Sequence, residues 1–315
     1  MTQEKLPHGL QDPFKKNGFK SIQQSVATSL TEIRTGMYGK RRVYPTNWER
    51  LNTNLLGGLQ PGKMYVVAGR PGVGKSAFSN QLIFDLLDRN KEKPLTVLYW
   101  SFEMPGYQQI LRAGAKGANK QISELLSVQE TLKQEEYEKY RDEVIKYNKY
   151  PIYFNNVPRD IEFIKDTNID VTNKYPDNTI INVFDHSRLI LSGKDQELQK
   201  LNEVSKGCMW LQAKIGCVNI LLSQLNRNIE QEHRAKAQYQ PLLTDLFGGD
   251  SIGQDAHVVL MLQRPHDLYG ITDTYCGENP IKLLAVHVEK NRDGLLGMIP
   301  YEAEMSTFTI NERKK

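Results

Sequence analysis

One segment of the chain combines glycines, a lysine and a hydroxyl at a spacing that suits phosphate binding. Residues 69–76 read G-R-P-G-V-G-K-S, a full match to the pattern G-x-x-x-x-G-K-[ST]. An apolar, β-branched run precedes them at 64–68, and residues 77–87 follow with apolar side chains at helical spacing. A strand, a glycine loop and a helix start in this order direct backbone N–H groups at a phosphate, which an ordinary glycine turn before a helix does not. The residues that we expect to bind a nucleoside triphosphate are Gly69, Arg70, Pro71, Gly72, Val73, Gly74, Lys75, Ser76 and Ala77.

Two residues of this loop have predicted roles of their own. Lys75 is expected to reach the β- and γ-phosphates, and the Ser76 hydroxyl to hold Mg²⁺. Further along, residues 179–184 form a mostly apolar run that ends at Asp185, the predicted second member of the Mg²⁺ site. An aspartate after such a run can also simply cap the next turn. The following residue is His186, where many phosphate-loop ATPases carry a glutamate, so the base that activates water must come from elsewhere.

Two other predicted strands end in polar residues that could complete the chemistry. Glu103 follows the run 97–102, and ligands of parallel sheets bind beyond the carboxyl ends of the strands, so Glu103 is the candidate general base. Its alternative role is to cap the helix that starts near Pro105. Gln224 is the candidate sensor of the γ-phosphate, and it opens a long polar segment, 226–254. That segment is either a switch that responds to the nucleotide or a solvated surface loop.

A pair of cations lies near the end of a later strand. Lys290 and Arg292 are two residues apart, so the alternation of a strand sends them to the same side. They are either solvated charges or fingers that stabilise transition-state charge on a γ-phosphate, typically in a neighbouring copy of the chain. The second role requires a ring or a filament.

The elements that must position these residues alternate along the chain from about Tyr44 onward. The alternation predicts an α/β fold with a mostly parallel, twisted sheet flanked by helices. The expected strands are 64–68, 96–101, 151–155, 179–184, 218–223, 257–262, 281–290 and 297–303. The expected helices are 75–90, 106–117, 134–148, 160–174 and 196–214. We expect residues 46–315 to form one domain.

The first 45 residues differ from the rest. They are basic, and Ile22, Val26, Leu30, Ile33 and Met37 repeat at the spacing of one apolar stripe on a helix. This helix either packs on its own domain or docks on a neighbouring protomer. We treat residues 1–45 as a basic N-terminal arm and amphipathic linker helix.

Composition excludes several classes of protein. Of the 315 residues 25% are charged, and no apolar run approaches the roughly 20 residues that a membrane span needs. The first 16 residues contain no apolar core of a secretory signal, and the three cysteines lack metal-ligand spacing. We therefore expect a soluble, cytoplasmic protein in a reducing compartment. The formal net charge of +4 is only weak support for a polyanionic partner.

These motifs, in this order and spacing, resemble the ATPase domain of the DnaB-like replicative helicases of the RecA superfamily, from about residue 44 to the end. Residues 69–76 are similar to the family's phosphate loop, 101–104 to its strand-end glutamate, and 223–227 to its sensor. Asp185 matches the family's metal-binding aspartate. Lys290 and Arg292 match its lysine and arginine fingers. The resemblance implies a RecA-like fold and a hexameric ring that hydrolyses ATP or another NTP with Mg²⁺ at subunit interfaces. It further implies movement along single-stranded DNA during replication, and docking of the 22–37 helix on the adjacent subunit.

The resemblance also places a DNA-binding loop around residues 245–256. The residues that it assigns to DNA are Arg227, Phe247, Gly248, Gly249 and Asp250. Phe247 and Gly248 stand where the family has an arginine and a glutamate, so Phe247 either stacks on a base or is buried, and the glycines offer backbone N–H groups. Only some 20 residues precede the linker helix, so primase and loader contacts are not carried over. The alternatives are a RecA-type, DNA-dependent ATPase that does not unwind, and a nucleotide-binding regulator without a DNA partner.

Overall fold

The structure, a computed structural model, describes residues 18–129, 131–192, 196–247 and 249–314. The chain divides into two units, Met1–Arg42 and Val43–Lys315. This division lies three residues before the boundary expected from the sequence. Its physical reason is Tyr44, which is buried and exchanges two backbone hydrogen bonds with Leu59 at 2.8 and 2.9 Å, so that it belongs to the second unit.

The first unit is described by one helix, α2 (Ile22–Met37), which has the bounds of the predicted apolar stripe. Ser21 and Gln24 form a capping box at its start, with Gln24 N donating to Ser21 Oγ at 3.2 Å. All five residues of the stripe are exposed. The helix therefore does not bury its apolar face within its own unit.

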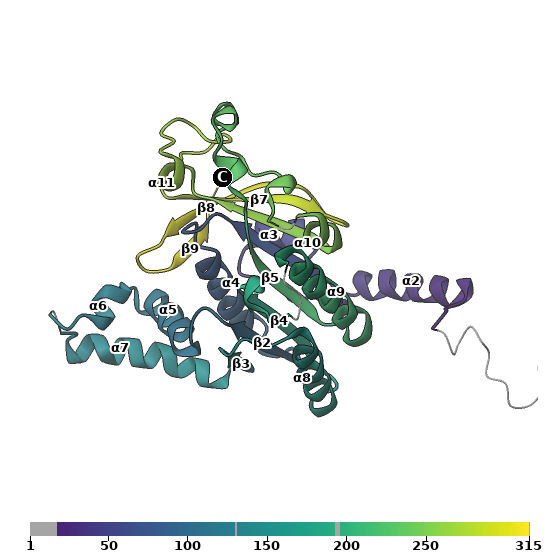
Figure 1. Ribbon diagram of the computed structural model, residues 1–315. Coiled ribbons are helices and arrows are strands. Elements are labelled where there is room, and N and C mark those ends of the chain that lie inside the picture. Colours follow the sequence, from purple (N-terminus) through teal and green to yellow (C-terminus); the bar gives the residue numbers. More distant parts are fainter. Residues whose placement is uncertain (1–17, 130, 193–195, 248, 315) are drawn as a thin grey trace, which may run out of the picture. The chain divides into compact units, whose positions relative to one another are not determined.

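A nine-stranded sheet forms the centre of the second unit, in the order β3-β2-β4-β5-β1-β6-β7-β8-β9 (Figure 1). The six strands from β3 to β6 are parallel, and β7, β8 and β9 continue antiparallel. The strands are β1 (Met64–Gly69), β2 (Leu95–Ser101), β3 (Ile152–Asn155), β4 (Thr179–Asp185), β5 (Val218–Gln224), β6 (Val258–Gln263), β7 (Leu283–Asn291), β8 (Gly297–Glu304) and β9 (Thr309–Glu312).

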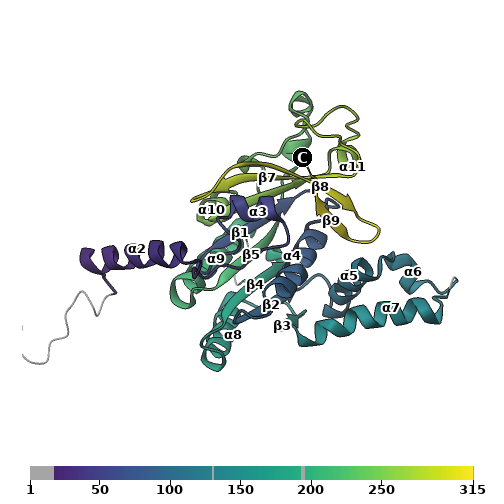
Figure 2. The same cartoon turned by 180° about the vertical axis from the view of Figure 1, so that it is seen from behind.

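Helices cover both faces of the sheet, and Figure 2 shows the same layers from behind. One face packs against α3 and α4, and the other against α8, α9 and α10. The helices are α3 (Glu49–Asn54), α4 (Lys75–Arg89), α5 (Gly106–Ala118), α6 (Ile122–Leu126), α7 (Gln134–Ile145), α8 (Ile161–Lys174), α9 (Glu197–Ile215), α10 (Gly249–Asp255) and α11 (Pro265–Tyr269). Within the described ranges, no helix has the length and apolar character to cross a membrane.

All eight expected strands and five expected helices of this unit are present, with shifts at their ends. The predicted strand at 281 begins only at Leu283, because Lys282 adopts a left-handed backbone with φ +53°. The helix predicted to reach residue 148 ends as an α-helix at Ile145 and continues as a 3-10 turn, Lys146–Lys149. The elements that were not predicted, α3, α6, α10, α11 and β9, are four to seven residues long, too short to show a period.

Candidate functional site

The phosphate loop connects β1 to α4 through a glycine-dependent turn. Gly72 and Gly74 have φ of +79° and +102°, a region that favours glycine, and Gly74 directly precedes the first turn of α4. A Cβ on Gly74 would come within 2.7 Å of Met305 Cε. The backbone conformation therefore favours glycine at both positions, and at Gly74 a side chain would also displace the flexible tip of Met305.

Lys75 lies at the start of α4 and folds back over the loop. Its Nζ donates hydrogen bonds to Gly69 O at 2.9 Å and to Arg70 O at 3.2 Å. Burial lowers the pKa of Lys75 to about 8, although the carboxylates of Asp185 and Glu103 act in the opposite direction. Two backbone carbonyls are weak partners for a buried ammonium. A group with full negative charge, such as a phosphate, would stabilise it better.

Asp185 lies at the end of β4, facing Ser76. The Ser76 hydroxyl donates to Asp185 Oδ1 at 3.3 Å, whereas Oδ2 is buried and has no hydrogen-bond partner among the described residues. Burial is also the main cause that raises the pKa of Asp185 to about 6. A hydroxyl and an orphaned buried carboxylate oxygen fit Mg²⁺, which prefers oxygen ligands and completes its shell with water and substrate phosphates. These two residues would hold the ion.

A cavity of about 330 Å³ opens above the loop and collects residues from most strand ends. Glu103 follows β2 and is exposed in this cavity, where it makes no hydrogen bond or ion pair with any described residue. Gln224 is the last residue of β5 and pairs with Gly69 in the sheet register. The residues that line the cavity are Pro71, Gly72, Gly74, Lys75, Ser76, Ala77, Glu103, Arg112, Asp185, His186, Gln224, Arg264, Met305 and Phe308. We name it the triphosphate cavity.

Five lining residues were not predicted as site residues: His186 directly after β4, Arg112 of α5, Arg264 after β6, and Met305 and Phe308 of the β8–β9 turn. The Arg112 guanidinium lies 4.9 Å from the centre of the Phe308 ring. Arg264 Nη1 lies 3.5 Å from Gly72 O. Arg264 could have been predicted as a site residue, because it follows a buried strand, as Glu103 does. Arg112, Met305 and Phe308 come from elements far apart in the sequence and match no motif.

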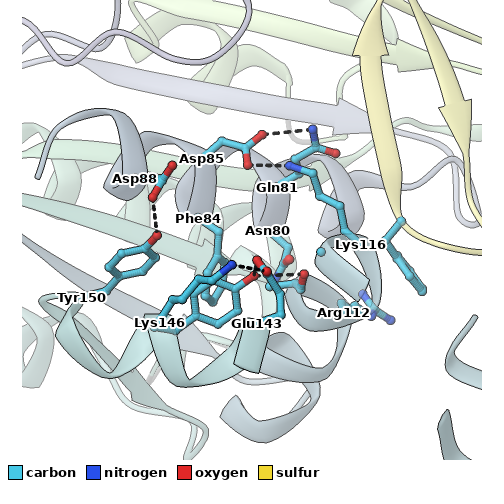
Figure 3. A pocket seen from close by; sticks show the side chains of 14 residues that line it. Asn80, Gln81, Phe84, Asp85, Asp88, Arg112, Lys116, Glu143, Lys146 and Tyr150 are labelled. Atoms are coloured by element: carbon cyan, nitrogen blue, oxygen red, sulfur yellow. Dashed lines mark hydrogen bonds and ion pairs between the residues drawn. The ribbon is translucent and has the colours of Figure 1, made fainter. Parts of the chain in front are cut away.

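Side chains of α4 attach the elements that carry Arg112 and Phe308. Lys116 Nζ pairs with Asp85 Oδ1 at 2.5 Å, which fastens α5 to α4 (Figure 3). Gln81 exchanges two hydrogen bonds with the backbone of Ile310, at 2.7 and 2.8 Å, which fastens β9 to α4. Because both attachments start from the helix that carries Lys75, the positions of Arg112 and Phe308 are set relative to the phosphate loop.

The side chain of Arg70 does not line the cavity, although Arg70 was predicted to bind the nucleotide. Its Nε donates to Glu230 Oε1 at 2.6 Å, and its Nη1 to Leu225 O at 2.9 Å. Its backbone carbonyl accepts hydrogen bonds within the loop, from Lys75 Nζ and from Val73 N, both at 3.2 Å. The structure therefore directs this guanidinium towards the segment that follows β5.

That segment, the 225–247 loop, is an ordered structure closed at its base. Leu225 and Leu246 form an antiparallel bridge, Asn226 N donates to Asp245 O at 2.7 Å, and Phe247 N donates to Gln224 O at 2.9 Å. Arg234 forms two hydrogen bonds with the buried Asp245, both of 3.0 Å. These contacts order the base of the loop, whereas most residues from 227 to 237 are exposed, so a nucleotide-responsive switch and a solvated surface loop both stay predictions.

The residues assigned to DNA lie at the two ends of this loop. Arg227 is exposed in a 3-10 turn, Arg227–Glu230, directly after β5. Phe247 is half-buried and packs against the core under α8 and α9. Gly248 lies outside the described residues, and Gly249 and Asp250 form the first turn of α10.

Lys290 and Arg292 lie at the opposite edge of the sheet from the phosphate loop. Lys290 lies near the end of β7 and Arg292 directly follows that strand, which is antiparallel to β6 and pairs there with the first residues of β6. Lys290 Nζ donates to Gly253 O and Gln254 O at 2.8 and 2.7 Å, and Arg292 Nη2 donates to Gln254 O at 2.9 Å. Both cations thus sit on the last carbonyls of α10, where a helix favours positive charge, and neither lines the triphosphate cavity.

Solved structures confirm the fold. One whose title describes an ATPase domain superimposes with a TM-score of 0.81 at 20% identity, covering 93% of this chain and 99% of that one. A second, titled "The Structure Of A DnaB-Like Replicative Helicase And Its Interactions With Primase", gives a TM-score of 0.78 at 20% identity over 93% of this chain and 67% of that one. The central sheet and its helices therefore have the fold of these two structures.

Sequence comparisons agree. The replicative DNA helicase DnaB of Rickettsia typhi is 24% identical over 99% of this chain and 66% of its own length. That of Geobacillus stearothermophilus is 27% identical over 94% of this chain and 63% of its own length. The chain thus spans about two thirds of the length of these relatives. The family described as the DnaB-like helicase C terminal domain matches residues 44–310, and the chain belongs to this family.

Proposed function

We propose that this chain is the NTP-driven motor of a hexameric, ring-forming DNA helicase that moves along single-stranded DNA during DNA replication. The observation that carries the proposal is the separation of two sets of groups across one sheet. The triphosphate cavity gathers the carboxyl ends of the parallel strands, and Lys290 and Arg292 lie at the other edge. A single chain cannot bring the two sets together, whereas a ring places the cations of one copy at the cavity of the next.

Within the cavity, each group has a role that its position supports. The loop N–H groups and Lys75 bind the phosphates, and Ser76 and Asp185 hold Mg²⁺, which neutralises phosphate charge when bound. Glu103, exposed in the cavity and without a hydrogen-bond partner among the described residues, orients a water and accepts its proton. Arg292 of the neighbouring copy stabilises the charge that develops on the γ-phosphate, with Lys290 beside it.

Gln224 connects the nucleotide to the DNA. Its side chain lines the cavity, and its backbone carbonyl accepts a hydrogen bond from Phe247 N at the base of the 225–247 loop. Loss of the γ-phosphate on hydrolysis would change the contacts of Gln224 and hence the position of that loop. Arg227, Phe247 and the N–H groups of residues 248–250 are the proposed contacts to single-stranded DNA.

The exposed stripe of α2 supports assembly into a ring. Five apolar side chains on one face of this helix are exposed, and such a face is normally buried. We propose that it docks on the adjacent subunit. A cytoplasmic site of action accords with a partner that is DNA.

Three measurements on one preparation test the proposal. They are NTP turnover with and without single-stranded DNA, the mass of the assembly, and strand separation on a forked duplex. The proposal predicts DNA-stimulated turnover, a six-membered ring and unwinding, with turnover and unwinding lost in Lys75→Ala. Open filaments with stimulated turnover but no unwinding would indicate a RecA-type ATPase of another kind. Turnover that is indifferent to DNA would contradict a motor on DNA altogether.

A further inference from the structure

One ion pair joins the phosphate loop to the 225–247 loop. Arg70 occupies the second position of the phosphate loop, and Glu230 ends the 3-10 turn that also carries Arg227. Arg70 Nε and Glu230 Oε1 are 2.6 Å apart, and a second nitrogen of the same guanidinium holds Leu225 O at 2.9 Å. The guanidinium therefore holds this segment at two points, one at its base and one at the end of its first turn.

The pair is shielded from water on the side of Arg70, whose side chain is 14% exposed against 43% for Glu230. Fully exposed ion pairs contribute little, but a charge-assisted hydrogen bond to a mostly buried guanidinium has a defined geometry. The far part of the loop is held separately. Gln263 Nε2 donates to Gln238 O and Tyr239 O at 3.0 and 2.8 Å, and the Tyr239 ring stacks on Tyr269 at 4.8 Å.

The main chain of Arg70 continues this connection into the nucleotide site. Its carbonyl is one of the two acceptors that hold Lys75 Nζ, at 3.2 Å. Pro71 follows directly, has a fixed φ and restricts the backbone of the residue before it, so the main chain between the Arg70 carbonyl and the rest of the loop has little freedom. A displacement of the Arg227–Glu230 turn would therefore pull on Arg70 and shift the carbonyl that positions the Lys75 ammonium.

We propose that the Arg70–Glu230 pair is a positioning link, through which single-stranded DNA seated at Arg227 sets the geometry of the phosphate loop and raises nucleotide turnover. The link deepens the proposed function and rests on it. Arg70 acts here through Lys75, not by touching the phosphates with its own guanidinium. The connection is reciprocal: nucleotide binding at the loop would change the affinity of the turn for DNA by the same factor as DNA changes the affinity for nucleotide.

The test compares Glu230→Gln and Glu230→Ala with the matched control Glu232→Gln. Glu232 lies two residues further on, is exposed, and makes no hydrogen bond or ion pair with any described residue. Turnover is measured without DNA and with saturating single-stranded DNA. In Glu230→Ala we expect basal turnover and nucleotide KM to be retained, while the stimulation ratio falls by about fivefold or more, the size of a typical coupling. Glu230→Gln keeps an acceptor oxygen and should lose less, and Glu232→Gln should keep the full ratio.

A double-mutant cycle with Arg70→Gln separates a link from a merely structural contact. If the two side chains act through each other, the stimulation ratio of Arg70→Gln/Glu230→Gln equals that of Arg70→Gln alone, instead of the product of two losses. A structural role would instead lower the melting temperature in step with both basal and stimulated turnover, and that result would overturn the link.

The outcomes distinguish the two proposals. If wild-type turnover is not stimulated by DNA, the proposed function fails and the link fails with it. If the wild type is stimulated and Glu230→Ala is stimulated equally, the link is overturned while the motor stands.

Discussion

The carboxyl ends of the parallel strands form one edge of the central sheet, and the opposite ends form the other. The two edges differ in how many of the groups needed for NTP hydrolysis each supplies. At the carboxyl edge, five parallel strands deliver a glycine loop, three carboxylate or amide side chains and an arginine to one cavity. At the opposite edge, Lys290 and Arg292 bind backbone carbonyls at the end of α10. The first edge has the groups to bind and orient a triphosphate. The second has the charge to stabilise its transition state and lies outside the triphosphate cavity.

Under the proposed function, two groups of residues that serve one reaction lie at opposite edges of the sheet and do not meet within one chain. β7 runs antiparallel to β6, so its last residues lie beside the first residues of β6. They are therefore at the edge opposite the phosphate loop. A pair of cations held by helix carbonyls is stable in the single chain, and it is also available to a neighbour. Each edge can be disabled without the other, and the changes below are ordered by the size of the loss.

Among these changes, replacing Arg292 at the second edge should reduce nucleotide turnover the most. In Arg292→Ala we expect nucleotide turnover to fall by about 10³-fold or more, since fingers of this kind contribute that much to phosphoryl transfer. Nucleotide binding should be retained, because Arg292 does not line the cavity of its own chain. Turnover and the binding of a fluorescent nucleotide are measured in parallel. Normal turnover in this variant would remove the second edge from the reaction.

Replacing Glu103, the proposed general base at the first edge, should reduce nucleotide turnover somewhat less. Glu103→Gln keeps the shape of the side chain but cannot accept a proton, so turnover should fall by about 10²–10⁴-fold. Binding should change little, because Glu103 makes no hydrogen bond with the described residues. Single-turnover kinetics isolate the chemical step. A variant that hydrolyses at the wild-type rate would mean that another cavity residue is the base.

The charge of Lys75 should make nucleotide binding depend on pH. Its pKa is lowered to about 8 by burial, so the ammonium is present below that pH and is lost as the pH rises through it. Affinity should therefore weaken by about tenfold between pH 7 and pH 9, as the charged fraction declines. Lys75→Arg stays charged over this range and serves as the control with a flat profile. An equally flat profile in the wild type would show that the charge of Lys75 does not contribute to binding.

Replacing Asp185 should have the smallest effect, a change in the stability of the folded protein. Burial raises its pKa to about 6, above its unfolded value, so the ionised form above pH 6 costs folding free energy. Asp185→Asn removes this cost and should raise the melting temperature by about 3–6 °C at pH 7.5. The difference should shrink as the pH falls through 6, where the wild-type carboxyl protonates. A lower melting temperature for Asp185→Asn would mean that the charged group is stabilised by contacts of the folded protein.

The position of most residues at the first edge could be predicted from the sequence. The phosphate loop, Glu103, Asp185 and Gln224 each follow or end a buried strand, and parallel strands must bring such residues to one edge. Arg112 and Phe308 were not predicted because they reach the cavity only through packing of α5 and β9 on α4. The direction of the Arg70 side chain could not be predicted for a related reason: the motif fixes its backbone, whereas its partner Glu230 lies 160 residues away.

A mixture of two inactive variants puts the shared site to a decisive test. Lys75→Ala lacks a working first edge and Arg292→Ala a working second edge. When the two are mixed and allowed to reassemble, some interfaces combine an intact phosphate loop from the Arg292→Ala chain with an intact arginine from the Lys75→Ala chain. We predict that turnover reappears in the mixture, although each variant alone is inactive. A mixture as inactive as its components would contradict a site shared between two copies.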